Sequence, residues 1–375
     1  AAINRSTDMT TGSIWKRMVS FAVPVFLGNL CQQLYNTVDS VIVGKFVGKQ
    51  ALAAVASSGN LIFMMTGFFM GLFIGAGIVI AQYFGARNYE KVRSAVHTDI
   101  AFALCCGVLL TLLGVFFTPT ILTWMRTPAD VLDTSILYFR LYFLGSLATI
   151  LYNAGMGILQ AVGDSRSPLY YLVISSAVNV ALDLLFVGAM DMGVAGAAVA
   201  TVISQVVSAV LCIIKLTRSD GPYRLEIKRI GFDLPLLKKI TSQGVPSGVQ
   251  NSIIAIANVV VQSNINTFGS DAMAGCGSYS KVEGFVFLPI TAFAMALTTF
   301  IGQNLGAKQY DRARRGARFG ILCSLLLFPQ GLFLLLFLLS LLLLNAGFFH
   351  AALAVSLASL ETGLLFSLSL AEKVF

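Results

Sequence analysis

Two acids lie deep inside long apolar stretches and are the residues best placed to do chemistry. Asn179 and Asp183 are four residues apart, so they would share one face of a helix, and Thr201 ends the small-residue run that begins at Gly196. Asp39 belongs to a polar stripe that recurs at three- and four-residue spacing: Asn29, Gln32, Gln33, Asn36, Asp39 and Ser40. Carboxylate, amide and hydroxyl oxygens are hard ligands, so Asp39, Asn179, Asp183 and Thr201 predict a site for a small cation such as Na⁺. Two buried like charges also repel each other, which makes proton uptake the competing chemistry.

Structural roles compete with this interpretation. The amides of the stripe could serve only to bond neighbouring helices. The hydroxyl of Thr201 could be donated to its own helix backbone, and this alternative is about as strong as a functional role. Both alternatives stay open from the residues alone.

A second set of polar residues is predicted to line a substrate cavity. Gln33 and Asn36 come from the first stripe. A similar stripe between 241 and 267 includes Asn258 and Gln262 and could face the first from the other side of a cavity. Glu283 begins the next apolar stretch and is either a cavity residue or a residue at the water interface.

The remaining titratable residues give no catalytic or metal-binding pattern. We expect His97 to be solvated and Asp99 to be interfacial, and neither histidine forms a metal pair. The six cysteines lie in or beside apolar stretches without a CxxC pair, which favours small buried residues over disulfides or zinc ligands. Walker, HExxH, GxSxG and Rossmann patterns are absent in a usable context, so we expect no enzyme activity, no cofactor and an ion gradient as the driving force.

The composition explains why buried acids matter. Of the 375 residues, 57% are hydrophobic and 11% are charged, far below the roughly 25% charge of a soluble domain. Disordered chains are poor in large apolar residues, so this class is excluded as well. The chain is therefore predicted to span a membrane several times, where a charge at mid-depth is costly and an acid is a functional candidate.

Ten apolar stretches are long enough to cross about 30 Å of hydrocarbon as helices. Their approximate limits are 16–43, 52–82, 95–118, 132–157, 168–189, 194–216, 241–267, 279–301, 317–344 and 347–370. The net charge is +8, and most basic residues fall before the first stretch or after even-numbered ones rather than in one patch. This distribution predicts a cytoplasmic N-terminus and argues against binding of nucleic acid.

The sequence contains an internal repeat. Residues 81–93 (AQYFGARNYEKVR) and 302–314 (GQNLGAKQYDRAR) share five identities at an offset of 221: Gln82/Gln303, Gly85/Gly306, Ala86/Ala307, Tyr89/Tyr310 and Arg93/Arg314. Both copies follow an even-numbered stretch, so the repeat is parallel, as in transporters that rock two bundles against each other. We predict an N-terminal tail (1–15), a six-helix lobe (16–216), a cytoplasmic linker (217–239) and a second lobe of about four helices (240–375). Two complete copies would exceed the chain by 67 residues, so we expect an incomplete second lobe.

These motifs together resemble the multidrug and toxic compound extrusion (MATE) family, in particular its bacterial DinF-like branch. The resemblance covers about residues 10–320, through Pro24 to Gly44, Gly48 to Ala54, Ala81 to Ala86, Leu159 to Arg166, Asn179 to Asp183, Gly193 to Thr201 and Ile301 to Ala307. It implies an all-α membrane protein of two pseudo-symmetric lobes with twelve helices (six in each), of which about ten are present here. It also implies a cation site at Asp39, Asn179, Asp183 and Thr201. From about Leu325 the sequence is rich in Leu and Phe, and there we expect it to depart from the family pattern.

The resulting hypothesis is an antiporter that exports organic, often cationic, drugs or metabolites against H⁺ or Na⁺ by alternating access. The alternative is a lipid-linked oligosaccharide flippase of the same superfamily, although the first-lobe helices hold almost no Arg or Lys for phosphates. A channel or a membrane enzyme is the third option. We expect a monomer in the bacterial cytoplasmic membrane, with a small organic molecule and the lipid bilayer as its partners.

Overall fold

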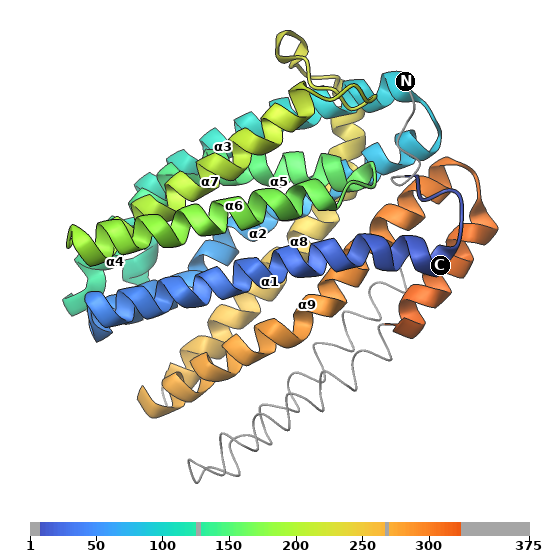
Figure 1. Cartoon of the computed structure of the whole chain (residues 1–375). Coiled ribbons are helices and arrows are strands. Elements are labelled where there is room, and N and C mark those ends of the chain that lie inside the picture. Colours follow the sequence, from blue (N-terminus) through green and yellow to red (C-terminus); the bar gives the residue numbers. More distant parts are fainter. Residues whose placement is uncertain (1–7, 125–128, 267–269, 324–375) are drawn as a thin grey trace.

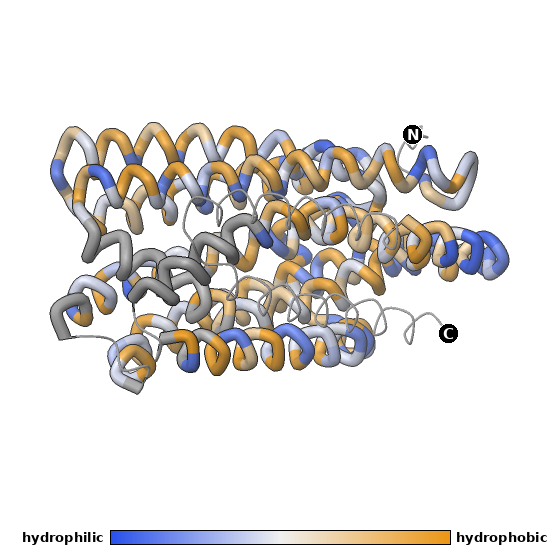
Figure 2. The backbone as a smooth tube through the Cα atoms, turned by 90° about the horizontal axis from the view of Figure 1, so that it is seen from below, coloured by the Kyte–Doolittle hydropathy of each residue, from blue (hydrophilic) through white to orange (hydrophobic). Residues whose placement is uncertain are grey.

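The computed structural model describes residues 8–124, 129–266 and 270–323, and this part of the chain consists of helices and their connections without a strand. Figure 1 shows the long helices lying side by side in one bundle. In Figure 2, apolar residues run along most of the length of the helices. The predicted all-α class is therefore confirmed.

The first eight predicted stretches are all helical, and most of the helices extend several residues beyond the predicted limits. Helix 310–323 follows the eighth, so only the start of stretch 317–344 is described, and stretch 347–370 lies outside the described residues. The elements are α1 (Ile14–Phe46), α2 (Lys49–Gly85), α3 (Tyr89–Trp124), α4 (Ala129–Leu144), α5 (Ser146–Ala161), α6 (Arg166–Asp183), η1 (Leu184–Ala189), α7 (Gly193–Thr217), η2 (Ile227–Arg229), α8 (Leu234–Asn266) and α9 (Ser270–Gly306).

Six helical spans within the described residues are long and apolar enough to cross a membrane, and a bent pair makes a seventh. The pair is Leu132–Leu144 and Ser146–Ala161, which meet at 46° where one straight helix was expected. The bend falls at Gly145, where a Cβ would lie only 2.7 Å from the Cγ2 of Val202 in α7. Glycine therefore lets the bend pack directly on the neighbouring helix. The 33-residue α1 is not among these spans, because its polar stripe lowers its hydropathy.

Helices α2 and α8 approach each other through glycines. A Cβ on Gly244 would lie 2.6 Å from the carbonyl oxygen of Leu72, and one on Gly248 would lie 2.8 Å from that of Phe68. From the other side, Gly71 and Gly75 leave no room for a side chain against the backbone of α8. Small residues allow backbones to pack this closely in membranes, where van der Waals contact holds helices together. The joint between the N-terminal helices and α8 is therefore a tight backbone contact.

The internal repeat is reproduced in the local structure. After α2, the amides of Ala86 and Asn88 donate to the carbonyls of Gln82 and Tyr83. After α9, the corresponding bonds run from Ala307 to Gln303 and from Gln309 to Asn304. Arg87 and Lys308, also 221 positions apart, both have left-handed backbone, with φ of 56° and 58°. The two copies of the motif therefore form the same helix end and turn.

The connection between α7 and α8 is fastened to α3. The backbone amide of Glu226 donates to Nε2 of His97 (3.0 Å), and the amide of Asp233 donates to Oγ1 of Thr98 (3.1 Å). Leu225 is buried in the main core cluster. This segment runs along the end of α3 in Figure 1. The expectation that His97 is solvated was wrong, because the side chain is 4% exposed and serves as a docking acceptor.

Asp99 was expected at an interface and is instead buried in α3, with 1% exposure. Among the described residues its Oδ1 atom has no hydrogen-bond partner. The prediction failed because the connection between α7 and α8 covers this end of α3. No local pattern in the sequence predicts that long-range contact.

Candidate cation site

The centre of the predicted site lies at a change of helix type. Helix α6 ends at Asp183, and the chain continues as the π-helix η1. Such π-helical turns occur frequently at functional sites, because they re-aim the side chains around them. Asn179 and Asp183 are 1% and 0% exposed. Within the described part of the chain, both amide atoms of Asn179 and both carboxylate oxygens of Asp183 lack a hydrogen-bond partner.

Asp39 reaches this place from α1, which packs against α6. Its carboxylate is near enough to Asp183 for the two to interact electrostatically. The structure therefore brings together the two acids that the sequence selected from stretches more than 140 residues apart. Buried polar groups are normally satisfied by partners, so unmatched oxygens beside a second carboxylate are the mark of a ligand site.

Two tyrosines complete the cluster, and the sequence did not select them. The hydroxyls of Tyr35 in α1 and Tyr138 in α4 both interact electrostatically with Asp39 and Asp183. A signal existed for Tyr35, which precedes Asp39 by four residues and so shares its helix face. Tyr138 gave no such signal, because its part in the site depends on how α4 packs against the other helices.

Thr201 is buried in α7, which packs against α6. Its hydroxyl donates to the carbonyl of Ala197 at 3.0 Å, as the structural alternative anticipated. This bond uses the proton and leaves lone pairs on the oxygen, which remains an acceptor. The back-bond and a role as an oxygen ligand are therefore compatible.

The donor set defines what this place can hold. It offers two carboxylates, an amide and phenolic or aliphatic hydroxyl oxygens, which suit a small hard cation or a proton. Among the described residues there is no group of three or more His, Cys, Asp or Glu side chains placed to hold a metal ion.

The predicted cavity residues are spread over three helices. Gln33 of α1 lies close to α9, because a Cβ added to Gly284 would be 2.9 Å from the Nε2 atom of Gln33. Glu283 is the residue next to Gly284 in α9. Asn36 is exposed, and so is Asn258 of α8. Gln262 lies in α8 with its side chain outside the described part of the structure. The structure thus brings Gln33 to the Glu283 turn of α9.

The end of the bundle that holds the N-terminal segment is fastened by two buried hydrogen bonds of Gln303 and by more exposed ones of Arg312. Gln303 of α9 accepts from the amide of Met9 (3.0 Å) and donates to the carbonyl of Ala161 in α5 (2.8 Å). Arg312 donates to the carbonyls of Gly12, Met9 and Thr11. Gln303 therefore joins α9 to both the N-terminal segment and α5 at this end.

A multi-helix bundle with membrane-length spans, and with two acids close together among its helices, defines a polytopic membrane protein. The comparison with known sequences agrees: the MatE family model matches residues 24–185 and 246–368. The chain therefore belongs to the MATE family, which is a family of transporters and not of enzymes. The second match includes the Leu/Phe-rich stretch, so the expected departure from the family pattern after about residue 325 was wrong.

Similar proteins carry names of the same kind. The chain is 33% identical over 316 residues to the probable multidrug resistance protein YoeA of Bacillus subtilis (strain 168), covering 82% of this chain and 68% of that protein. It is 25% identical to the probable multidrug resistance protein NorM of Thermotoga maritima, covering 84% and 68%. The chain thus spans about two thirds of the length of these relatives.

Solved structures show the same fold. A MATE protein in a straight conformation has 25% identity and a TM-score of 0.79, covering 88% of this chain and 74% of that chain. A multidrug resistance MATE transporter of the MOP superfamily in an outward-facing conformation has 24% identity and a TM-score of 0.81, with the same coverage.

Proposed function

We propose that this chain exports small organic molecules, often cationic drugs or metabolites, in exchange for H⁺ or Na⁺. The single observation that carries the proposal is the pairing of the buried Asp183 with the half-buried Asp39, with Asn179 offering unmatched polar atoms one turn away from Asp183. Relatives named as multidrug resistance proteins support the class of substrate.

The coupling follows from electrostatics. Without a bound cation, the carboxylates of Asp39 and Asp183 repel each other, and both oxygens of the buried Asp183 lack a partner among the described residues, which is costly. A proton or Na⁺ removes part of that cost and draws α1 and α6 together. Because α1 also carries Gln33, which lies near α9, a shift of α1 would reach the proposed substrate cavity. An ion and a substrate that favour different arrangements of α1 then lower each other's affinity.

The orientation belongs to the same proposal. Basic residues crowd the connections at the end that holds Met9 and Gln303, which supports a cytoplasmic location for the N-terminus. The bonds of Gln303 join α9, α5 and the N-terminal segment at that end, which supports a state that opens toward the outside. We further propose two lobes, with the division in the segment between α7 and α8, and a monomer as the working unit.

The test is transport by the chain in proteoliposomes, with a fluorescent organic cation as substrate. A pH gradient and a Na⁺ gradient are imposed separately. We expect one of the two to drive uptake, and Asp39→Asn and Asp183→Asn to abolish the driven component. Asp133→Asn is the matched control, because Asp133 is an exposed acid of α4.

Each other outcome has a defined meaning. Full gradient-driven uptake in both aspartate variants would overturn the coupling role of the pair. Ion flux without countertransport would assign the chain to channels. Movement of a lipid-linked oligosaccharide, with no movement of the dye under either gradient, would favour the flippase.

A further inference from the structure

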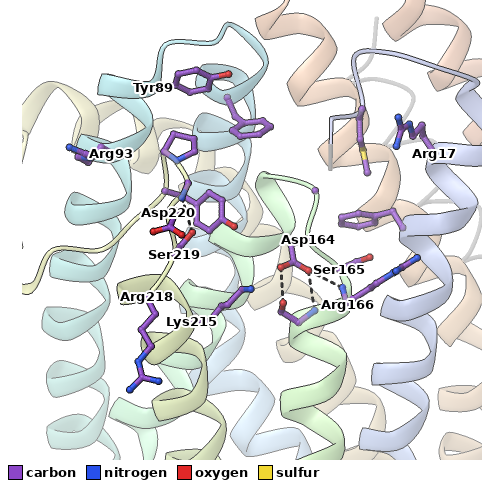
Figure 3. Close-up of a pocket in the computed structure, with 18 of the residues that line it drawn as sticks. Arg17, Tyr89, Arg93, Asp164, Ser165, Arg166, Lys215, Arg218, Ser219 and Asp220 are labelled. Atoms are coloured by element: carbon purple, nitrogen blue, oxygen red, sulfur yellow. Dashed lines mark hydrogen bonds between the residues drawn. The ribbon is translucent and has the colours of Figure 1, made fainter. Parts of the chain in front are cut away.

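A cavity of about 800 Å³ lies at the end of the bundle that holds the N-terminal segment, remote from the Asp39–Asp183 site. It is bounded by α1, α3, α6, α7 and the segment that follows α7. Five cationic side chains from four separate parts of the sequence line it: Arg17, Arg93, Arg166, Lys215 and Arg218. Figure 3 shows Lys215 extending from α7 toward α6. Only two acids, Asp164 and Asp220, are among the lining residues.

Most of the positive charge in this cavity is not neutralised. Arg93 faces Glu226 at 3.7 Å, a long and partly exposed ion pair. Within the described residues, the side chains of Arg166, Lys215 and Arg218 form no hydrogen bond or ion pair. Asp164 is already engaged, because its carboxylate accepts from the amides of Arg166 and Ser167 and from the Ser167 hydroxyl. These three exposed cations therefore line one cavity without an ion pair among the described residues, and the exposed Asp220 is the acid of the lining left to offset them.

The cavity lies at the level of the helix ends, which is where lipid head groups lie in a membrane. Arg166 is the first residue of α6, Lys215 lies in the last turn of α7, and Arg17 lies in the first turn of α1. These helix ends mark the boundary between hydrocarbon and water. Below them α1 and α6 expose apolar side chains, including Val19, Val23, Val173 and Ile174. A chain anchored by its head group in the cavity could rest on that apolar surface.

We propose that this cavity binds a phosphate group, carried by an anionic phospholipid of the cytoplasmic leaflet or by a free phosphate compound. Guanidinium and ammonium groups are the standard partners of phosphate oxygens, and they bind through charge-assisted hydrogen bonds. The hydroxyl of Ser219 lines the same cavity; it accepts from the amide of Gly221 and keeps its own proton free to donate. Basic pockets between helices on the cytoplasmic side are a known means of holding lipid head groups. The inference uses the proposed orientation and is independent of ion coupling.

The bound phosphate would also tie the helices together. It would link α6 and α7 at the ends from which they run to Asp183 and Thr201. Its occupancy is therefore expected to stabilise the folded bundle, because a ligand that binds only the native state adds to stability.

The experiment measures binding to the purified chain in a neutral detergent by native mass spectrometry and by thermal unfolding. The probes are phosphatidylglycerol, phosphatidylcholine and inorganic phosphate. The test variant is Arg166→Gln, Lys215→Gln, Arg218→Gln. The matched control is Arg224→Gln, Lys228→Gln, Lys238→Gln, which removes the same charge from exposed residues outside the cavity. A third variant, Arg166→Lys, Lys215→Arg, Arg218→Lys, keeps the positive charge. It shows whether the test variant loses binding because the charge is gone or because the protein no longer folds.

We expect phosphatidylglycerol to bind and to raise the unfolding temperature, with roughly 100-fold weaker binding in the test variant. The control and the charge-keeping variant should stay within about threefold of the parent. Binding of phosphatidylglycerol alone assigns the phosphate to a lipid, and binding of inorganic phosphate at similar affinity assigns it to a free compound. The proposal is overturned if the test variant and the control lose binding equally, or if no anionic probe binds better than phosphatidylcholine.

Discussion

Gly306 lies in direct backbone contact with Gln82: a Cβ at this glycine would overlap the carbonyl oxygen of Gln82. The reverse contact has the same form, because a Cβ on Gly85 would overlap the carbonyl oxygen of Gln303. The two pairs are related by the 221-residue repeat, so the ends of α2 and α9 pack on each other as two copies of one motif. A duplicated motif that contacts its own copy is placed on the pseudo-symmetry axis, where relative rotation of the two halves needs the least movement.

Replacement of either glycine by alanine is predicted to force α2 and α9 apart. The added carbon meets backbone rather than a flexible side chain, so the overpacking should cost about 1–3 kcal/mol even after the gain in helix propensity. Thermal unfolding in detergent measures the loss. Gly77→Ala in α2 is the control, because the nearest atom to its Cβ would be 3.7 Å away. Equal unfolding temperatures for Gly85→Ala, Gly306→Ala and Gly77→Ala would contradict the contact.

Gln303→Ala is predicted to release the N-terminal segment. The variant leaves the buried amide of Met9 and the carbonyl of Ala161 without their partner, at about 1–3 kcal/mol for each unmatched group. A cysteine placed at Met9, which is 3% exposed, should then react faster with a thiol reagent. Gln309→Ala, at an exposed position six residues along, should leave the labelling rate unchanged. Unchanged labelling in Gln303→Ala would show that Met9 is held by other contacts.

The sequence predicted the parts of this molecule that depend on helical period and on burial. Asp39, Asn179 and Asp183 stood out because an acid in an apolar helix is costly, and the acids do lie together. The repeated motif that the sequence shows forms the same turn after α2 and after α9. The helical period shows on which face of its own helix a residue lies, but not which other helix packs against that face. Three features depend on which helices pack together, and no local sequence pattern predicts this. They are the place of Tyr138 in the site, the contact of His97 with the segment after α7, and the presence of Arg166 and Lys215 in one cavity.

Tyr35→Phe and Tyr138→Phe are predicted to weaken the coupling ion without removing it. Each variant deletes a hydroxyl that interacts with both carboxylates and keeps the ring that packs in the bundle. Both hydroxyls interact with the carboxylates electrostatically and not through a hydrogen bond, so the ion concentration for half-maximal transport should rise by roughly two- to fivefold. Tyr170→Phe, at an exposed position of α6, is the control. A changed maximal rate at an unaltered half-maximal concentration would point to a structural role only.

His97→Phe is predicted to undock the segment between α7 and α8 from α3. The phenyl ring fills the buried site and offers no acceptor to the amide of Glu226, which then loses its 3.0 Å bond. Because Glu226 also pairs with Arg93 and Arg229, the ion pairs should loosen with it. Limited trypsin digestion reports the change through cleavage after Arg224, Lys228 and Arg229. Thr98→Val, which removes the acceptor of the Asp233 amide, should increase cleavage in the same direction. Cleavage that stays slow in His97→Phe would mean that Leu225 and the core around it hold the segment alone.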